Sequence, residues 1–412
     1  MNESAAGVTQ PGARRILYIH NSADLYGASR SLLRLVGELD RSRYEPHVLL
    51  PDDGPLRFEL ERAGARVHVS RCVAEVSRAL VRSWKILPFL AGLPIFVLML
   101  SRWIKRQEIA LVHSNVALVV TGGAAAKLAG VPHVWHVREF FHEFRPLWWW
   151  YSRYLLHCAD AVVCVSAAIA RQFPATARKV VVVHNGLPVR EFEAVSRSRV
   201  LRFRAQHGLR DARLVGLVGR IKLKRKGQDV FVRAAALLKD RYPDVRFVII
   251  GSPFPGNETH LVRLEELIGS LGLNEHVVLT GDVEDIKAAC KSLDISVLAS
   301  VDPEPFAGVV LESMALGVPV VATRSGGTPE QIVDGVSGLL VPPNDPHGLA
   351  DAIAMLLDDS ALAHSLARSA FERVTGHFLL DRAVARLTDL YDALDEDRST
   401  WLPQLRPDPE QP

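Results

Sequence analysis

Short apolar runs rich in β-branched residues alternate with longer amphipathic stretches along most of this chain. In the first half, six such runs predict strands, and helical periodicity fills intervals between them, for example over residues 29–39 and 120–129. The predicted strands are residues 15–20, 47–50, 110–114, 133–137, 161–165 and 180–184. This alternation is typical of a parallel sheet with helices on both faces.

The alternation is interrupted once and then resumes. The turn sequence Asn-Gly-Leu-Pro at 185–188 breaks it, and an Arg-rich helical stretch follows at 190–206. Five further strands are predicted at 214–220, 246–251, 276–281, 294–300 and 318–323. A chain of 412 residues is too long for one ordinary core. We therefore predict two α/β domains of similar size, at residues 14–187 and 196–374.

The two ends differ from the alternating middle. Apolar residues recur at helical spacing between Leu380 and Leu394, which predicts a last helix within residues 376–395. The polar stretch 1–13 and the Pro-rich stretch 398–412 are predicted to be disordered. The first of these lacks the apolar middle of a signal peptide, so we expect a cytoplasmic location.

One uncharged apolar run, residues 86–100, stands out in the first domain. Trp and basic residues flank it on both sides, and a membrane span needs about 20 apolar residues, so the run is short. One interpretation is a buried helix; the other is peripheral contact of residues 84–106 with the cytoplasmic face of a membrane. Both stay open, and the aromatic run 146–151 can likewise be core or membrane-facing.

Composition narrows the class of protein only modestly. Hydrophobic residues make up 48% and charged residues 23%, as in soluble globular proteins, and a net charge of +3 does not indicate nucleic-acid binding. The four cysteines form no CxxC pair, so reduced, buried thiols are expected. Dinucleotide, P-loop, HExxH and Cys/His cluster motifs are missing from the sequence, so we expect neither a metal nor a cofactor.

Two carboxylates bracket an apolar run, EPFAGVVLESMALGVPV, in the second domain. Glu304 precedes a proline and so lies outside a helix, whereas Gly317 marks a helix end. A helix is therefore predicted over 308–316, with Glu312 on its second turn. Glu304 can equally be a simple helix cap, and Glu312 an exposed residue. The N–H groups at the helix start, where an anion can approach, are those of Phe306, Ala307 and Gly308.

A basic loop, GRIKLKRKGQD, follows the first predicted strand of the second domain. In it, Arg220 and Lys226 can clamp a diphosphate, because arginine supplies a planar fork of donors and lysine a point charge. A solvated loop and a nucleic-acid patch are the alternatives. No aromatic residue interleaves with these charges, which argues against nucleic acid.

Three further segments add candidate residues. Gly27, in YGASRSLLRL, lies in a turn at a helix start directly after the first strand. His136, in VWHVREFF, ends a buried strand at the edge where α/β proteins bind ligands, although a lone histidine there is more often structural. The segment SGGTPEQ predicts either a helix start capped by Thr328 or a plain tight turn.

Taken in order, these segments resemble the GT-B-fold retaining glycosyltransferases of family 4, also described as glycosyl transferases group 1. The resemblance extends from Arg15 to about Leu394. It rests on YGASRSL, PHVWHVREF, VVHNGLP, GRIKLKRKGQD, EPFAGVVLESMALGVPVVAT and SGGTPEQIVDGVSGLLVPPND. It implies two Rossmann-like parallel-sheet domains facing a deep cleft, the first on the acceptor side and the second on the donor side. The last helix would cross back to the first domain.

The resemblance also implies roles for the candidate residues. Arg220 and Lys226 would hold the diphosphate of a nucleotide sugar. Glu312 would bind the ribose, Glu304 the hydroxyls of the transferred sugar, and His136 would lie near the reacting centre. The catalytic set is thus His136, Glu304, Arg220 and Lys226, and further donor contacts are Gly27, Phe306, Ala307, Gly308 and the loop at Val283 beside the nucleobase. The basic loop is one residue longer than usual, so Arg225 competes with Lys226, and Ala307 replaces a common glycine.

The implied function is a metal-independent, retaining hexosyltransferase that uses a nucleotide-sugar donor. Its acceptor would be a glycan or a lipid-linked molecule in cell-surface polysaccharide or glycoconjugate synthesis, with no nucleic-acid partner. One alternative is a catalytically silent nucleotide-sugar-binding subunit, which the retention of Arg220, Lys226 and Glu312 disfavours. The other is a GT-B epimerase or phosphorylase, which does not share the context of Glu304 and Glu312.

Overall fold

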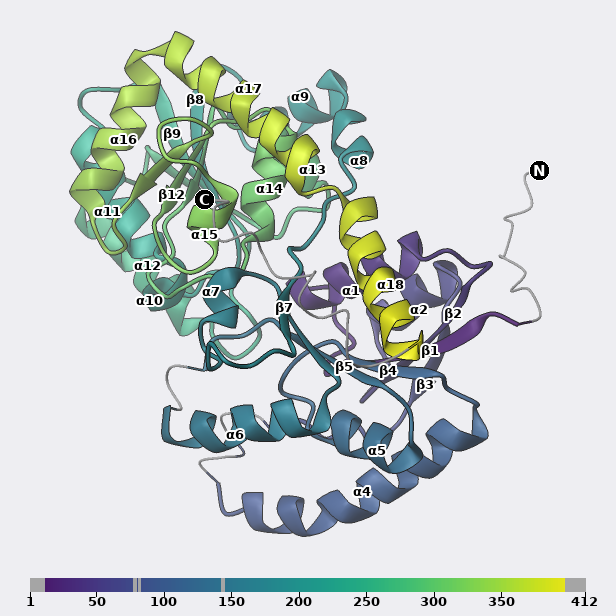
Figure 1. Cartoon of the computed structure of the whole chain (residues 1–412). Helices are drawn as coiled ribbons and strands as arrows, with labels where there is room; N and C mark the ends of the chain where they lie inside the picture. Colours follow the sequence, from purple (N-terminus) through teal and green to yellow (C-terminus); the bar gives the residue numbers. More distant parts are fainter. Residues whose placement is uncertain (1–11, 77–79, 81–82, 142–144, 397–412) are drawn as a thin grey trace. The chain divides into compact units, whose positions relative to one another are not determined.

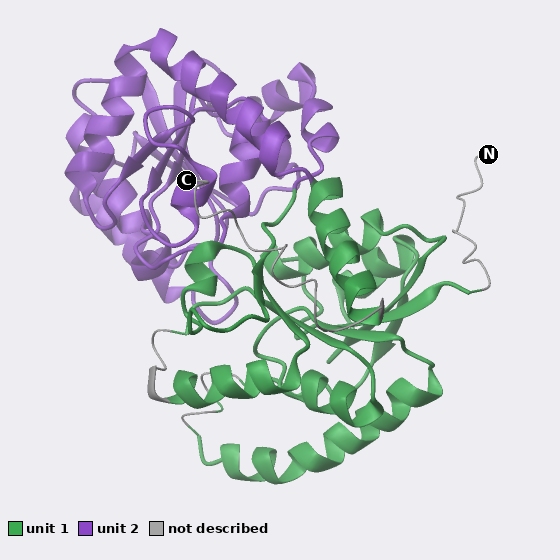
Figure 2. Ribbon diagram, in the orientation of Figure 1, with its two compact units in different colours: residues 1–186, 380–411 green, residues 187–379, 412 purple. Residues whose placement is uncertain are grey.

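The computed structural model describes residues 12–76, 80, 83–141 and 145–396, which divide into two compact units (Figures 1 and 2). Unit 1 comprises the described residues up to Gly186 and those from Leu380 onward, and unit 2 comprises Leu187–Leu379. The ends predicted to be disordered, 1–13 and 398–412, lie outside the described residues except for Gly12 and Ala13.

The sheet of unit 1 is parallel throughout and has seven strands in the described part of the chain. Its strands are β1 (Arg14–Ile19), β2 (Tyr44–Leu50), β3 (Arg66–Val69), β4 (Leu111–Ser114), β5 (His133–Val137), β6 (Ala161–Cys164) and β7 (Val180–Val182). Their order is β3-β2-β1-β4-β5-β6-β7. Strand β3 was not predicted, because this edge strand, RVHV, is only partly buried and contains no apolar run.

Helices cover both faces of this sheet (Figure 1). One face carries α1 (Gly27–Glu38), α2 (Pro55–Arg62) and α18 (Leu380–Glu396), and the other carries α4 (Ile86–Arg106), α5 (Thr121–Ala129) and α6 (Arg145–Cys158). The short helix α7 (Ala167–Ala170) follows β6. Leu387, Leu390 and Tyr391 of α18 share a core with the strands of unit 1. The predicted return of the last helix to the first unit is confirmed, although the helix begins at Leu380 and not at residue 376.

Unit 2 repeats the architecture with a parallel sheet of six described strands. These are β8 (Arg213–Val218), β9 (Val245–Ile250), β10 (Val277–Gly281), β11 (Ile295–Leu298), β12 (Val320–Thr323) and β13 (Leu339–Val341). Their order is β10-β9-β8-β11-β12-β13. Strand β13 was not predicted, because it has only three residues and directly follows a Gly-rich turn.

Helices also flank both faces of the second sheet. In chain order they are α8 (Arg190–Glu193), α9 (Arg197–Gln206), α10 (Leu223–Lys226), α11 (Gln228–Leu238), α12 (Thr259–Ser270), α13 (Ile286–Lys291), α14 (Gly308–Ala315), α15 (Thr328–Gln331), α16 (Pro346–Asp358) and α17 (Ser360–His377). Helices α11, α12 and α16 pack together, and α9, α13 and α14 pack together (Figure 1). The stretch 190–206, predicted as one helix, is two, because the backbone is extended at Ser196.

The chain passes from one unit to the other after Gly186 and again after Leu379. Next to both crossing points, contacts within unit 2 hold the backbone. The Leu187 N–H donates to the Phe378 carbonyl at 2.8 Å, and a bridge pairs Leu187 with Leu379. The Phe378 ring lies against Phe306, with centroids 5.6 Å apart. Residues 187–195 and 375–379 belong to unit 2, whereas the predicted domains covered 14–187 and 196–374.

The strand order of each sheet reverses once, between β1 and β4 in unit 1 and between β8 and β11 in unit 2. Helices that follow the two strands at such a reversal leave on opposite faces, so their loops diverge and leave a crevice at the carboxyl ends. Gly27 follows β1, the basic loop follows β8, and Glu304 follows β11. The fold therefore brings the separate sequence motifs to the edges where α/β sheets bind ligands.

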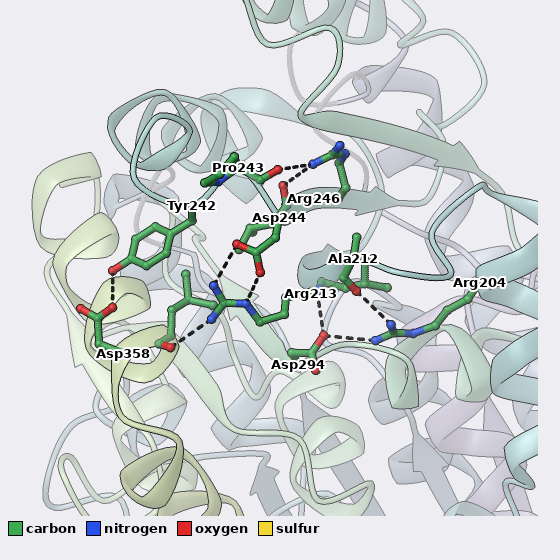
Figure 3. Close-up of polar contacts among 12 residues, drawn as sticks. Arg204, Ala212, Arg213, Tyr242, Pro243, Asp244, Arg246, Asp294 and Asp358 are labelled. Atoms are coloured by element: carbon green, nitrogen blue, oxygen red, sulfur yellow. Dashed lines mark hydrogen bonds and ion pairs between the residues drawn. The ribbon is translucent and has the colours of Figure 1, made fainter.

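Polar contacts join neighbouring segments at the amino edge of the unit 2 sheet (Figure 3). Arg213, at the start of β8, makes two bonds to the Asp244 carboxylate, at 2.6 and 3.1 Å. Asp294 accepts from the Leu214 N–H at 2.7 Å and from the Arg204 guanidinium at 3.1 Å. These contacts tie α9 and the strand starts together at the edge opposite the basic loop.

A glycine at the end of α10, at the carboxyl edge of the same sheet, allows a test of the packing between the basic loop and the end of β11. Gly227 has φ +68°, and a Cβ there would lie 1.9 Å from the Ala299 carbonyl oxygen. We expect Gly227→Ala to lower the free energy of unfolding by about 2–4 kcal/mol, since backbone strain and a backbone clash combine. Urea denaturation measures this loss.

Gly208→Ala is the matched control. Gly208 has the same φ of +68°, but no atom lies within 4 Å of its added Cβ. Only the left-handed backbone should then cost stability, about 1 kcal/mol. Equal losses in the two variants would show that the close approach of Ala299 contributes nothing.

Candidate functional site

An ion pair joins the two loops at the strand reversal of unit 2. Lys226 Nζ donates to Glu304 Oε1 at 2.7 Å, and Ser300 Oγ donates to the same oxygen at 2.8 Å. Glu304 is only 7% exposed. Burial alone would raise the pKa of this carboxyl, but the Lys226 ammonium and the Ser300 hydroxyl outweigh it and hold the pKa below its ordinary value. Glu304 is therefore ionised, and its partner explains a carboxylate within an apolar run.

Main-chain contacts fix the loop that carries Lys226. Gln228 Nε2 donates to the Arg220 carbonyl at 2.8 Å, and Gln228 Oε1 accepts from the Lys222 N–H at 3.3 Å. The Arg225 carbonyl accepts from the Val301 N–H at 3.0 Å, which ties the basic loop to the Glu304 loop. Of the two residues that compete for the lysine role, Arg225 thus supplies a backbone contact, and Lys226 supplies the ammonium at Glu304.

Arg220 begins the same loop and lies at the surface. Its guanidinium carbon is 5.2 Å from the centre of the Phe254 ring, within the range of a cation–π contact. Phe254, which follows β9 and is 42% exposed, was not among the predicted site residues. Two cations of one loop, Arg220 and Lys226, therefore lie at the carboxyl end of β8, and an aromatic ring braces the first.

The start of α14 differs from the expectation. The Ala307 N–H, expected to contact sugar or phosphate, donates to Gln331 Oε1 at 3.1 Å, and Gln331 Nε2 donates back to the Ala307 carbonyl at 2.8 Å. The Gly327 N–H also donates to the Glu304 carbonyl at 2.8 Å. The prediction of Thr328 as a helix cap is wrong, because Gly327 is the N-cap and Thr328 is the first residue of α15. The segment 325–331 braces the Glu304 loop.

Glu312 and Val283 lie beyond these loops. Glu312 is half-buried on the second turn of α14, and its charge adds to burial in raising the pKa of the Cys290 thiol on α13. Val283 lies in the loop before α13, whose N-cap Asp285 accepts from the Ala288 N–H at 3.1 Å. The structure places both on the side of unit 2 that α13 and α14 cover.

In unit 1, the loop after β1 carries Gly27, the first residue of α1. The Asp24 carboxylate accepts from the Tyr26 N–H and from the Ser29 hydroxyl, each at 2.9 Å. His20 lies 3.0 Å from Ser29 Oγ and 3.1 Å from Asn115 Nδ2. Because Asn115 follows β4, these contacts join the two loops at the strand reversal of unit 1. No motif in the sequence pointed to Asn115.

His136 is buried at the end of β5 among polar side chains. Its Nδ1 lies 3.2 Å from His113 Nε2 and 3.3 Å from an Arg138 guanidinium nitrogen. Arg138 also donates to Asn185 Oδ1 at 2.7 Å. Burial, followed by the charge of Arg138, lowers the pKa of His136 well below its usual value, so the ring is neutral. Within the described ranges, His136 Nε2 is buried and has no hydrogen-bond partner.

A buried carboxyl follows Arg138. The Glu139 side chain accepts from the Arg138 N–H at 3.0 Å and the Ala117 N–H at 3.3 Å. Burial raises the pKa of this carboxyl to about 7 in spite of those donors. No group of three or more His, Cys, Asp or Glu side chains in the described residues is arranged to hold a metal ion.

Comparison with known proteins supplies the family. Residues 201–373 match the family profile described as Glycosyl transferases group 1, and residues 26–191 match Glycosyltransferase Family 4. The two ranges do not overlap and together cover more than half of the chain. The chain belongs to glycosyltransferase family 4. Every candidate residue of this family 4 chain lies inside one of the two matched ranges.

Curated relatives match parts of the chain. A D-inositol 3-phosphate glycosyltransferase of Corynebacterium urealyticum is 35% identical over 187 residues, which are 44% of this chain and 43% of the relative. A GDP-mannose-dependent alpha-(1-6)-phosphatidylinositol monomannoside mannosyltransferase of Mycolicibacterium smegmatis is 35% identical over 211 residues, 48% of this chain and 52% of the relative. The matched part thus spans about half the length of these relatives.

Solved structures show the fold. HepE of Anabaena in complex with UDP aligns with a TM-score of 0.79 at 24% identity, over 92% of this chain and 100% of that one. Sucrose-phosphate synthase of Thermosynechococcus elongatus aligns with a TM-score of 0.74 at 21% identity, over 93% and 99%. The predicted GT-B fold of two Rossmann-like domains is confirmed for this family 4 chain.

The ion pair between Lys226 and the buried Glu304 yields a stability prediction. Glu304→Gln keeps the side-chain shape but leaves the Lys226 ammonium without its carboxylate. We expect the free energy of unfolding to fall by about 1–3 kcal/mol in urea denaturation. Glu191→Gln, which removes an exposed partner of Lys287 in the same unit, should cost less than about 1 kcal/mol. A loss no larger in Glu304→Gln than in Glu191→Gln would contradict a stabilising role for the pair.

Proposed function

We propose that this chain is a hexosyltransferase that moves a sugar from a nucleotide-diphosphate donor to a glycan or lipid-linked acceptor. The observation that carries the proposal is the Lys226–Glu304 pair at the strand reversal of unit 2, with Arg220 on the same loop. This arrangement places cations suited to a diphosphate beside a carboxylate suited to sugar hydroxyls. Support comes from relatives named as glycosyltransferases, one of them GDP-mannose-dependent, and from the UDP complex of HepE.

The charges suit departure of a diphosphate without a metal. Breaking the bond between the anomeric carbon and the diphosphate oxygen leaves negative charge on the phosphate. Arg220 and Lys226 can stabilise that charge. A lysine ammonium has three donors, so Lys226 can bind phosphate while it keeps Glu304. Ser300 continues to hold Glu304 if that bond lengthens. In this scheme, Glu312 binds the ribose, and Val283 lies beside the nucleobase.

We further propose retention of configuration by attack on the face that the diphosphate leaves. The acceptor hydroxyl forms the new bond to the anomeric carbon, and its proton passes to the leaving phosphate oxygen. The engagement of Glu304 Oε1 by Lys226 and Ser300 supports this assignment, because a carboxylate held in this way is a poor covalent nucleophile. The acceptor would bind unit 1 near His136.

A panel of nucleotides and nucleotide sugars tests the function. We expect one nucleoside diphosphate to raise Tm, and to do so equally with EDTA present. Arg220→Ala and Glu312→Ala should raise its Kd at least tenfold, about 1.4 kcal/mol, because each removes a charged contact. His136→Ala should mainly slow transfer, measured as release of nucleoside diphosphate.

Lys224→Ala is the matched control, because it removes one charge from the same loop at an exposed position. Its Kd should stay within about twofold of wild type. Turnover like that of wild type in all three site variants would refute the assignment. Nucleotide binding without turnover on any acceptor would indicate a silent binding subunit instead.

We also propose that unit 1 contacts a membrane through α4 and α6, which flank α5 on one face of its sheet (Figure 1). The alternative of a buried helix is wrong for most of α4, since its buried residues are Leu100, Ser101 and Ile104, near its end. Large apolar side chains are exposed on both helices and just before α4. They are Trp84, Leu87, Leu90, Ile95, Leu98 and Met99, with Leu147, Trp149 and Trp150 of α6.

The geometry favours a helix that lies on the membrane surface. Helix α4 is long and apolar enough to cross a membrane, and it is the one such helix among the described residues. Its uncharged part, 86–101, is about 24 Å long, short of the roughly 30 Å of a hydrocarbon core. Both ends connect to strands of one sheet, β3 and β4, which a crossing helix would separate. The basic residues at 102–106 suit anionic headgroups.

The cysteines support the cytoplasmic face. Cys72, Cys158, Cys164 and Cys290 are all buried and form no disulfide. Secreted domains more often pair their cysteines, so unpaired thiols suit a reducing compartment.

Liposome co-sedimentation tests the contact. The double variant Ile95→Glu/Leu98→Glu should reduce binding to vesicles with anionic lipid at least fivefold, because it places two charges at the proposed headgroup boundary. Leu237→Glu, at an equally exposed apolar position on α11 of unit 2, should leave binding unchanged. Binding that does not respond to the double variant would refute the proposal.

A further inference from the structure

A chain of buried polar rings links the last helix to His136 inside unit 1. Tyr391 Oη, on α18, lies 2.7 Å from His113 Nδ1 on β4. His113 Nε2 lies 3.2 Å from His136 Nδ1 on β5. All three side chains are at most 2% exposed. Residues that are 278 positions apart in the sequence thus share one hydrogen-bonded chain.

Arg138 determines which atom donates and which accepts in each hydrogen bond between these rings. A guanidinium only donates, and an Arg138 nitrogen lies 3.3 Å from His136 Nδ1, so that ring nitrogen accepts. A neutral imidazole whose Nδ1 accepts carries its proton on Nε2. For the same reason, the nitrogen of His113 that faces His136 must donate, and the other ring nitrogen accepts from the Tyr391 hydroxyl.

The environment supports neutral rings. Burial, followed by the Arg138 charge, lowers the pKa values of His113 and His136 well below the usual range. The Tyr18 hydroxyl, 3.4 Å from Tyr391 Oη, can donate to Tyr391 and so complete the chain. Each polar atom along it, up to His136 Nδ1, then has a partner of the correct kind.

We propose that Tyr391, His113 and Arg138 are positioning residues that together hold His136 as the neutral Nε2–H tautomer, so that His136 donates a hydrogen bond to a ligand oxygen and does not accept a proton. His136 Nε2 is buried and has no partner in the described part of the chain. An unpaired buried donor costs free energy, which a hydroxyl or phosphate oxygen of a ligand bound at unit 1 would recover. The identity of that ligand rests on the proposed function, but the tautomer does not.

NMR of the full chain, labelled with ¹⁵N histidine, tests the tautomer directly. Long-range ¹H–¹⁵N correlations distinguish the two neutral tautomers and the imidazolium, and His113→Gln and His136→Gln identify the two signals. We expect the Nε2–H form for both rings at pH 7 without ligand. An Nδ1–H form or an imidazolium at His136 would overturn the proposal.

Tyr391→Phe tests the relay. Loss of the hydroxyl leaves His113 Nδ1 without its donor and weakens the hold of His113 on His136, so it should shift the His113 signals and lower kcat about 5- to 50-fold, with the KM of the donor changed less than threefold. Tyr44→Phe is the control. It removes a hydroxyl that donates to Asp392 of α18 at 2.6 Å but does not belong to the row of hydrogen-bonded rings. Equal effects of the two variants, or unchanged His113 signals in Tyr391→Phe, would refute the relay.

His136→Gln separates a donor from a base. Glutamine keeps an N–H near the place of Nε2, so it should retain at least tenfold more kcat than His136→Ala if His136 donates. A base role predicts that both variants are equally inactive, which would overturn the proposal. If no donor supports transfer at all, the proposed function fails, while the NMR spectra still decide the tautomer.

Discussion

The Lys226–Glu304 ion pair is the contact on which the architecture of the unit 2 site depends. It spans the reversal between β8 and β11, so one bond positions both a cationic loop and an acidic loop. A buried carboxylate is tolerated only with such a partner, and a lysine with two donors to spare still suits an anionic ligand. Gln228 and Gln331 brace the two loops through backbone atoms, so the loops themselves keep their shape without further contacts to the charged side chains.

In unit 1, neutral side chains join the loops at the strand reversal. Its reversal is bridged by His20 and Asn115, and His136 belongs to a chain of rings whose charges burial suppresses. Neutral donors and acceptors avoid the desolvation cost of ions. Because an imidazole or a hydroxyl can either donate or accept, a group that only donates must set which role each atom takes. Arg138 does this in unit 1. The two units therefore share a fold but differ in how their ligand edges are built.

Sequence reasoning succeeded where a pattern is local. Strands such as β1 and β8, and the limits of α14, follow from apolar runs and from proline and glycine positions. It failed at β3 and β13, which are short and lack a strong pattern. It also left the burial of α4 open, because an apolar run looks the same whether another element covers it or not. Thr328 was misassigned since its cap geometry depends on the loop that Gln331 holds.

The sequence alone determined the two parallel-sheet units, the last helix and the motifs that surround Gly27, His136, Arg220, Glu304 and Glu312. Periodicity and turn residues encode these features within a few positions of each other. Only the tertiary structure decided the partner of Glu304, the occupation of the Ala307 N–H and the link from Tyr391 to His136. These contacts join residues from 24 to 278 positions apart, and no local pattern records which side chains a crossover brings together.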